Sequence, residues 1–360
     1  MATTVMEKIG RLFINLQQVR QVPQLLREAV PSIPATVQDV EVPRFFRECY
    51  IFAGYRPLHQ GWRYYFLSLF QRHNETINVW THLLGALAVL TKAAELAETI
   101  EFLRDPHSWP LLILLLSSIT YMTFSAVAHL LSAKSELYHY AFYFLDYVGV
   151  AQYQYGSAVA HFYYAIEKSW YTRVWGIFMP VASFLCCLSC LGCCFGKYQN
   201  YSLPSWIRKV SQVLPSALAY AWDTSPVFHR VYLWYLSCGE KDSTNDYAVT
   251  FHCGQLAFFL SSAFFFTYPL PESLFPGHCD FLGQGHQLFH VLLVFCTLSQ
   301  IHASYLDYLS RRDLYTSLHG DSDAQVFVLL YLVTTVICTQ IVAYMIKKVK
   351  CLLVEKARLD

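Results

Sequence analysis

Five polar residues of the kinds that bind or activate a metal ion lie inside or beside long apolar stretches of this sequence. They are Ser125, His129, Asp146, His286 and His290. Ionisable side chains are costly in hydrocarbon, so within such stretches they mark functional sites. Two histidines four residues apart share one face of a helix, which is a zinc-chelating spacing. The pattern therefore predicts a zinc site.

The predicted roles follow from the chemistry of each side chain. We expect His129, His286 and His290 to bind Zn²⁺ and to leave a fourth tetrahedral position open for water. Asp146 is expected to orient a ligand or the bound water, or to act as a general base. Ser125, one helical turn before His129, could bond the water or a substrate oxygen. Two alternatives stay open: the same residues could form hydrogen bonds between helices without a metal, and His82 could replace one ligand.

The composition predicts an integral membrane protein. The chain has 360 residues, of which 55% are hydrophobic and 14% charged, against about 25% charged residues in a typical soluble domain. Apolar residues gather in runs of about 20, the length that crosses a bilayer as a helix. We expect no secretory signal, because the first run of spanning length begins near Ile77. A net charge of +1 argues against a nucleic-acid partner.

Hydropathy predicts eight spans and therefore an all-α, polytopic membrane helix bundle. The spans cover about 77–98, 109–131, 138–163, 174–195, 206–223, 248–268, 285–308 and 325–346. We expect a cytoplasmic N-terminal region over 1–76, a seven-span core over 77–310, and a linker, eighth span and basic cytoplasmic tail over 311–360. Apolar residues at helical spacing between Val5 and Val19 predict an amphipathic helix on a membrane surface.

The basic residues predict how the spans are oriented, because cytoplasmic loops carry an excess of Lys and Arg. The N-terminal region, the tail and the loops after the second, fourth and sixth spans contain 18 of them, and the other loops contain 7. Both termini are therefore expected in the cytoplasm. In this topology His129, Asp146, His286 and His290 all fall in the inner half of the bilayer.

The cysteines do not suggest a disulfide framework. Of the 12 cysteines, five crowd one apolar run: Cys186, Cys187, Cys190, Cys193 and Cys194. We interpret them as small buried side chains. Palmitoylation of Cys193 or Cys194, at the end of the run, is a hypothesis.

The polar pattern resembles that of the progestin and adipoQ receptor family. Ser-x-x-x-His, then Asp, then His-x-x-x-His recurs there and in the wider superfamily that includes the alkaline ceramidases. Further stretches resemble the membrane progestin receptor branch: 54–57, 73–83, 125–136, 144–149, 225–230 and 283–290. The resemblance covers about residues 40–310. The stretch from Met1 to Leu26 is most similar to the alpha type, with the beta type second.

The resemblance implies a plasma-membrane steroid receptor that binds progestins and signals rapidly without entering the nucleus. It implies coupling to inhibitory G proteins, a role in oocyte maturation, and a seven-helix bundle with a cytoplasmic N-terminus. The zinc ligands of the family carry over to His129, His286 and His290, its aspartate to Asp146 and its serine to Ser125.

Two classes of function stay open at the level of sequence. A steroid needs an apolar cavity with a few polar donors, and the phase of the spans suggests Gln152, Tyr153, Gln154 and Gln287 for that role. The alternative is a zinc-dependent, ceramidase-like lipid amidase, which a steroid could regulate. There zinc would lower the pKa of its bound water and polarise the amide carbonyl, and Asp146 would move protons. The residue pattern suits hydrolysis as well as binding, and only the branch resemblance favours the receptor.

Overall fold

The computed structural model describes residues 33–199, 203–237 and 246–359. The chain divides into two compact units, residues 1–35 and 36–360. The amphipathic helix expected between Val5 and Val19 lies outside the described residues. All helices and strands that the structure describes lie in the second unit.

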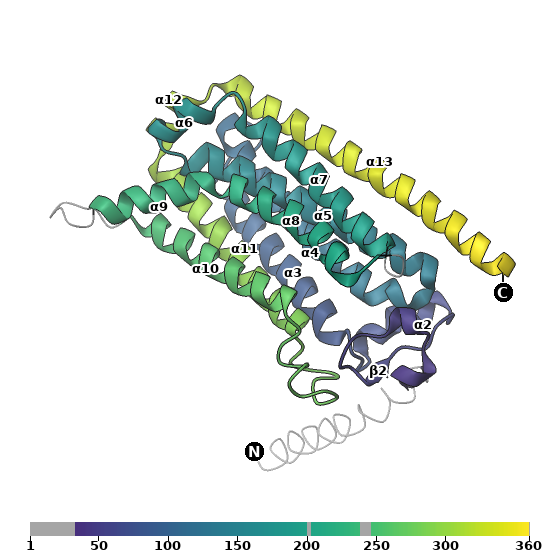
Figure 1. Ribbon diagram of the computed structural model, residues 1–360. Coiled ribbons are helices and arrows are strands. Elements are labelled where there is room, and N and C mark those ends of the chain that lie inside the picture. The colour runs from purple at the N-terminus through teal and green to yellow at the C-terminus, as the bar shows by residue number, and fades with distance from the viewer. Residues whose placement is uncertain (1–32, 200–202, 238–245, 360) are drawn as a thin grey trace, which may run out of the picture. The chain divides into compact units, whose positions relative to one another are not determined.

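Long helices dominate this unit (Figure 1), which confirms the all-α prediction. They are α3 (Thr76–Ala97), α4 (Trp109–Leu131), α5 (Glu136–Ala160), α7 (Phe178–Tyr198), α8 (Ser205–Asp223), α10 (Tyr247–Thr267), α11 (Gly285–Ser310) and α13 (Asp321–Leu359). Each one covers one of the eight segments predicted from hydropathy. The largest difference is at α13, which continues as a helix through the basic tail instead of ending near residue 346.

Shorter elements connect the long helices. They are η1 (Asp39–Glu41), η2 (Arg44–Phe46), α2 (Trp62–Leu67), η3 (Ser68–Phe70), η4 (Pro106–Ser108), η5 (Ser132–Lys134), the π-helical η6 (His161–Ala165), α6 (Lys168–Val174), α9 (Ser225–Ser237) and α12 (Arg312–Leu318). Two short strands, β1 (Val37–Gln38) and β2 (Ala53–Tyr55), pair antiparallel. The sequence analysis predicted neither this strand pair nor α9.

Six of the described helical segments are long and apolar enough to cross a membrane. They are Thr76–Ala97, Pro106–Lys134, Phe178–Tyr198, Tyr247–Thr267, Gly285–Ser310 and Asp321–Arg358. Helices α5 and α8, both predicted as spans, are too polar to be among them. These two helices carry several of the polar residues that face the interior, such as Asp146 and Gln152 on α5. The protein is a polytopic membrane helix bundle.

Helix α4 lies at the centre of the helix bundle. Helices α3 and α5 flank α4, α5 also packs on α7, α7 packs on α8, and α11 packs on α3 and α10. Helix α13 lies along α5 and α7 (Figure 1). The most apolar 18-residue stretch of the segment that contains α4 is 61% buried, whereas the corresponding stretch of α13 is only 22% buried. A helix that is apolar on all sides belongs in the interior, whereas most of α13 presents its apolar side chains outward.

Glycines allow α5 to approach α4 closely. A Cβ atom added at Gly149 would lie 2.8 Å from Tyr121 Cα, and one added at Gly156 would lie 2.1 Å from Ser117 Oγ. Small residues at such crossings let the backbones of membrane helices approach each other. This contact places the Asp146 turn of α5 against the C-terminal half of α4.

The start of α11 is held by side chains that replace missing helical hydrogen bonds. Gln284 and Gln287 form a reciprocal capping box, and Glu272 Oε2 accepts a hydrogen bond from Gly285 N at 2.8 Å. The first turns of α11, which carry His286 and His290, are thereby fixed against the rest of the bundle.

Candidate metal centre

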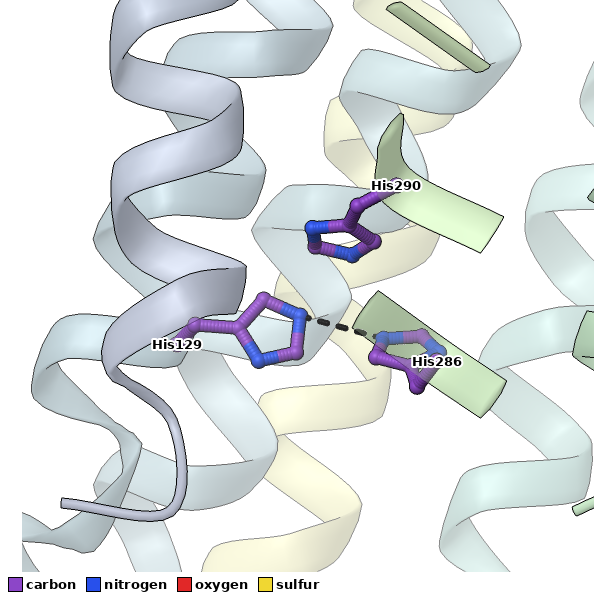
Figure 2. Close-up of side chains that lie close together, drawn as sticks. All are labelled: His129, His286 and His290. Carbon is purple, nitrogen blue, oxygen red and sulfur yellow. Dashed lines mark hydrogen bonds between the residues drawn. The ribbon is translucent and has the colours of Figure 1, made fainter. Parts of the chain in front are cut away.

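The structure brings together the three histidines that the sequence singled out. His129, at the end of α4, faces His286 and His290 in the first turns of α11, and the three rings point toward one another (Figure 2). One nitrogen from each ring lies within 4.8 Å of the other two. His129 and His290 are buried, and His286 is half-buried.

The distance between the rings suits a tetrahedral metal ion. His129 Nε2 lies 3.3 Å from His286 Nε2. In a tetrahedral zinc site with Zn–N distances of about 2.0–2.1 Å, two ligand nitrogens lie about 3.3–3.4 Å apart. His290 contributes the third nitrogen, which lies within 4.8 Å of the other two. The three imidazoles therefore fit a zinc ion with one position left for water.

A carboxylate fixes the tautomer of the first histidine. Glu75 Oε2 lies 2.7 Å from His129 Nδ1 and also accepts a hydrogen bond from Asn78 Nδ2 at 2.6 Å. Because a carboxylate only accepts, Nδ1 of His129 carries the proton and Nε2 is free to bind a metal. Burial by itself raises the pKa of Glu75, but attraction to His129 and the hydrogen bonds from His129 and Asn78 outweigh it and hold that pKa below its usual range.

The backbone fixes the tautomer of the second histidine. The carbonyl oxygen of Asn78 accepts a hydrogen bond from His290 Nδ1 at 3.2 Å, which leaves Nε2 of His290 free. His82 lies parallel to His290, with ring centroids 3.7 Å apart and an interplanar angle of 2°. His82 supports that ring from the side, and its nitrogens are not part of the three-nitrogen cluster.

A buried arginine holds the end of α4. The Arg56 guanidinium donates to the carbonyl oxygen of His129 at 2.7 Å and also to that of Leu130. Carbonyl groups in the last turn of a helix lack intrahelical partners, so Arg56 supplies them. The backbone of His129 is therefore held by Arg56, and its ring by Glu75.

Asp146 and Ser125 lie close to the cluster but do not join it. Asp146, on α5, is near enough for electrostatic attraction to His129 and Lys197. Among the described residues no hydrogen bond joins Asp146 to any of the three histidines. Ser125 is buried on α4, one turn before His129.

A pocket of about 460 Å³ reaches the cluster. His129, His286 and Glu75 line its inner part, and aromatic side chains such as Phe45 and Tyr143 line its walls. A small molecule or water can therefore approach the two histidines through a cavity that is partly apolar.

Of the four proposed steroid donors, Gln152, Tyr153 and Gln287 occupy different settings. Gln152 makes two long hydrogen bonds to α13, with Thr335 and Tyr331, both at 3.4 Å. Tyr153 donates to Gln300 Oε1 at 2.7 Å. Gln287 Oε1 accepts from the backbone of Gly283 at 2.9 Å within the cap of α11, so its amide has a structural role.

A second buried polar cluster lies at the other end of α11 from the three histidines, where α11 ends and α10 begins. Arg230 donates to Asp307 Oδ2 at 2.6 Å and to Asp246 Oδ2 at 2.7 Å. His252 Nε2 lies 2.8 Å from the same Asp307 oxygen. These bonds connect α9, the start of α10 and the end of α11, and they neutralise a carboxylate that is fully buried.

Three of the five cysteines on α7 are buried, as expected, and Cys187 and Cys193 are half-buried. Cys186, Cys190 and Cys194 are buried, and Cys193 Sγ lies 3.9 Å from Gln212 O on α8. Full burial of Cys194 argues against its palmitoylation.

Comparison with known proteins places the chain in a family. Residues 70–301 match the model of a family described as haemolysin-III related. The chain is 58% identical to membrane progestin receptor alpha-B of Danio rerio, over 99% of both chains. The chain belongs to the haemolysin-III-related, progestin and adipoQ receptor family. It is also 56% identical to membrane progestin receptor alpha of Cynoscion nebulosus and 48% identical to membrane progestin receptor beta of Homo sapiens, again over 99% of both chains. The resemblance to this branch, with the alpha type first, is confirmed.

Sequence reasoning gave no role to two residues that hold the cluster. Glu75 and Arg56 both lie in stretches that resemble the family, yet they are far in sequence from the histidine that they contact. A signal was present, because a carboxylate directly before a predicted span and an arginine in an aromatic segment are both candidates for buried partners.

Proposed function

We propose that this protein is a membrane receptor for progestin steroids. The observation that carries the proposal is the similarity to membrane progestin receptors, at 58% and 56% identity over 99% of each chain. Residence in the plasma membrane, rapid signalling, coupling to inhibitory G proteins and a role in oocyte maturation are parts of the proposal that rest on the family resemblance alone.

The proposed membrane arrangement has seven core spans and an eighth. The core spans are α3, α4, α5, α7, α8, α10 and α11, and α13 is the eighth. Helices α5 and α8 are more polar than the others, but α5 packs against α4, α7 and α13, which can shield its polar face from lipid. The excess of Lys and Arg then favours cytoplasmic termini.

We propose that His129, His286 and His290 hold Zn²⁺. The support is the 3.3 Å Nε2–Nε2 distance and the two hydrogen bonds that leave an Nε2 atom free on His129 and His290. A bound zinc ion would supply a Lewis acid and a water of lowered pKa at the end of the pocket. Glu75 orients one ligand, and Asp146 is placed to hold or accept a proton near it.

Saturable binding of labelled progestin to the purified protein in lipid nanodiscs tests the receptor function. We expect about one displaceable site per chain and no competition by cortisol-like steroids. Of Gln152, Tyr153 and Gln287, Gln152 has only hydrogen bonds of 3.4 Å and is the one most easily redirected to a steroid carbonyl, so Gln152→Leu should weaken binding. Absence of saturable binding in zinc-loaded protein would exclude the receptor function.

A second candidate is a zinc-dependent lipid amidase with ceramide as the leading substrate. The pocket that reaches His129 and His286, with Asp146 nearby, favours this function. Asp146→Asn should retain zinc and abolish ceramide hydrolysis, whereas His290→Ala should lose zinc. Unchanged hydrolysis in Asp146→Asn would assign that residue a structural role. A zinc complement equal to that of the wild type in His290→Ala would remove His290 from the ligand set.

A further inference from the structure

The opening of the metal-centre pocket is strongly basic. Among the described residues that line the pocket, five carry a positive charge and two a negative one: Arg47, Arg56, Lys197, Arg208 and Lys209 against Glu48 and Glu75. Arg56 and Glu75 are committed to the backbone and ring of His129. The rest of the lining contains four further cations and one further carboxylate, that of Glu48. We refer to Arg47, Lys197, Arg208 and Lys209 as the basic mouth.

Lys197 extends the basic mouth into the pocket. It lies in the last turn of α7, and its ammonium group sits 4.0 Å from the centroid of the Tyr143 ring. Glu48, Glu75 and Asp146 attract it electrostatically, but none of the described carboxylates lies within ion-pair distance of it. An ammonium group held against an aromatic wall in this way is stabilised further by a negative group that contacts it directly. A ligand with a negative group supplies this contact.

The basic mouth lies at the edge of the lipid-facing surface. Helix α8 begins beside it, and Trp206, Val210 and Leu214 are 65%, 48% and 53% exposed. Their spacing of four residues puts these apolar side chains on one outward face of α8. Tryptophan next to basic residues at the end of such a face is typical of the headgroup level of a bilayer. Lys209, which is exposed, therefore lies where lipid headgroups lie.

We propose that the basic mouth binds the phosphate group of an anionic phospholipid from the leaflet that it adjoins. Phosphate oxygens accept several charge-assisted hydrogen bonds at once, which matches a group of arginine and lysine donors. The exposed face of α8 offers the acyl chains an apolar surface beside the headgroup. The bound headgroup would cover the opening through which small molecules reach His129 and His286. A soluble phosphate ester has the same charged group but would leave this apolar surface unused.

The test measures lipid bound to the full-length, zinc-loaded protein. The protein is reconstituted in nanodiscs of phosphatidylcholine alone or with a minority of phosphatidylinositol phosphate, and retained lipid is measured by native mass spectrometry. The variants are Lys197→Gln, Lys209→Gln and the pair combined. The control is Lys347→Gln combined with Lys350→Gln, which removes two exposed charges from the basic part of α13.

We expect selective retention of the anionic lipid, weakened about fivefold by each substitution in the basic mouth and unchanged in the control. Lys209 is exposed, so Lys209→Gln gives a folded variant even if Lys197→Gln does not fold. Equal loss in the control would overturn the proposal, because general charge would then explain binding. Absence of any preference for the anionic lipid would also overturn it.

Soluble inositol phosphate separates the two sources of phosphate. We expect it to compete weakly with the lipid. If it binds as tightly as the lipid in phosphatidylcholine discs, the ligand is a soluble phosphate ester and the lipid proposal is wrong. Progestin binding is measured on the same samples, so that loss of the receptor function is seen separately from loss of lipid binding.

Discussion

Glu75 offers the sharpest test of the metal centre, because one of its oxygens accepts hydrogen bonds from both His129 and Asn78. Oε2 accepts from His129 Nδ1 at 2.7 Å and from Asn78 Nδ2 at 2.6 Å. In Glu75→Gln the amide oxygen can take the place of Oε2 and keep both hydrogen bonds while the negative charge is lost. In Glu75→Ala both bonds are lost. The two variants therefore separate the charge of Glu75 from its positioning of His129.

The expected magnitudes follow from the kind of hydrogen bond. A hydrogen bond to a charged group contributes about 1.5–3 kcal/mol and a neutral one about 0.5–1.5 kcal/mol. The difference of about 1–1.5 kcal/mol corresponds to a five- to tenfold loss of zinc affinity in Glu75→Gln. Removal of a partner that orients a metal-binding histidine costs up to about 100-fold, which is the loss expected for Glu75→Ala.

The assay is competition for zinc between purified protein and a chromophoric chelator at neutral pH. The control is Glu95→Gln, which removes a carboxylate charge from an exposed position on α3. Glu95 forms an ion pair with Lys92 at 3.0 Å, so its substitution should leave zinc affinity unchanged. Wild-type affinity in both Glu75 variants, or an equal loss in Glu95→Gln, would refute the reasoning.

The remaining predictions concern stability, measured by thermal unfolding in detergent. Chelation of the metal should lower the melting temperature, because a ligand at 100 times its Kd stabilises the folded state by about 2.7 kcal/mol; an unchanged melting temperature would argue against a metal bound to the native state. Arg230→Met should cost about 3–5 kcal/mol, because it leaves the buried Asp307 carboxylate without its arginine; melting at the wild-type temperature would show that His252 alone suffices. Gly192→Ala should cost about 1–3 kcal/mol, because its Cβ would lie 2.2 Å from Ser211 O on α8. Gly176→Ala, with nothing within 4 Å, is the matched control.

The positions of the long helices could be predicted from sequence, because hydropathy and helical spacing act over neighbouring residues. The eight predicted segments correspond to the helices α3, α4, α5, α7, α8, α10, α11 and α13. Helix α13 continues past the predicted end of the span near residue 346, because the basic residues that follow tolerate helix as well as coil. Helix α5 is not among the described helices that are apolar enough to cross a membrane, because polar side chains that face a bundle lower the mean hydropathy of the helix that carries them.

The candidate metal ligands could also be predicted, and for a similar reason. His286 and His290 share a helix face because they are four residues apart. The predicted topology places His129 at the same depth in the bilayer. The sequence by itself thus determined which histidines could meet.

Only the tertiary structure decided what holds these histidines and what surrounds them. Glu75 lies 54 positions from His129, and Arg56 lies 73 positions from it; no local pattern encodes either pairing. The same is true of the basic mouth, whose cations come from η2, α7, α8 and the segments beside them. It is true of Gln287, predicted as a steroid donor, which the cap of α11 engages. Periodicity fixes which residues share a face of one helix, whereas the packing of several helices fixes which faces meet.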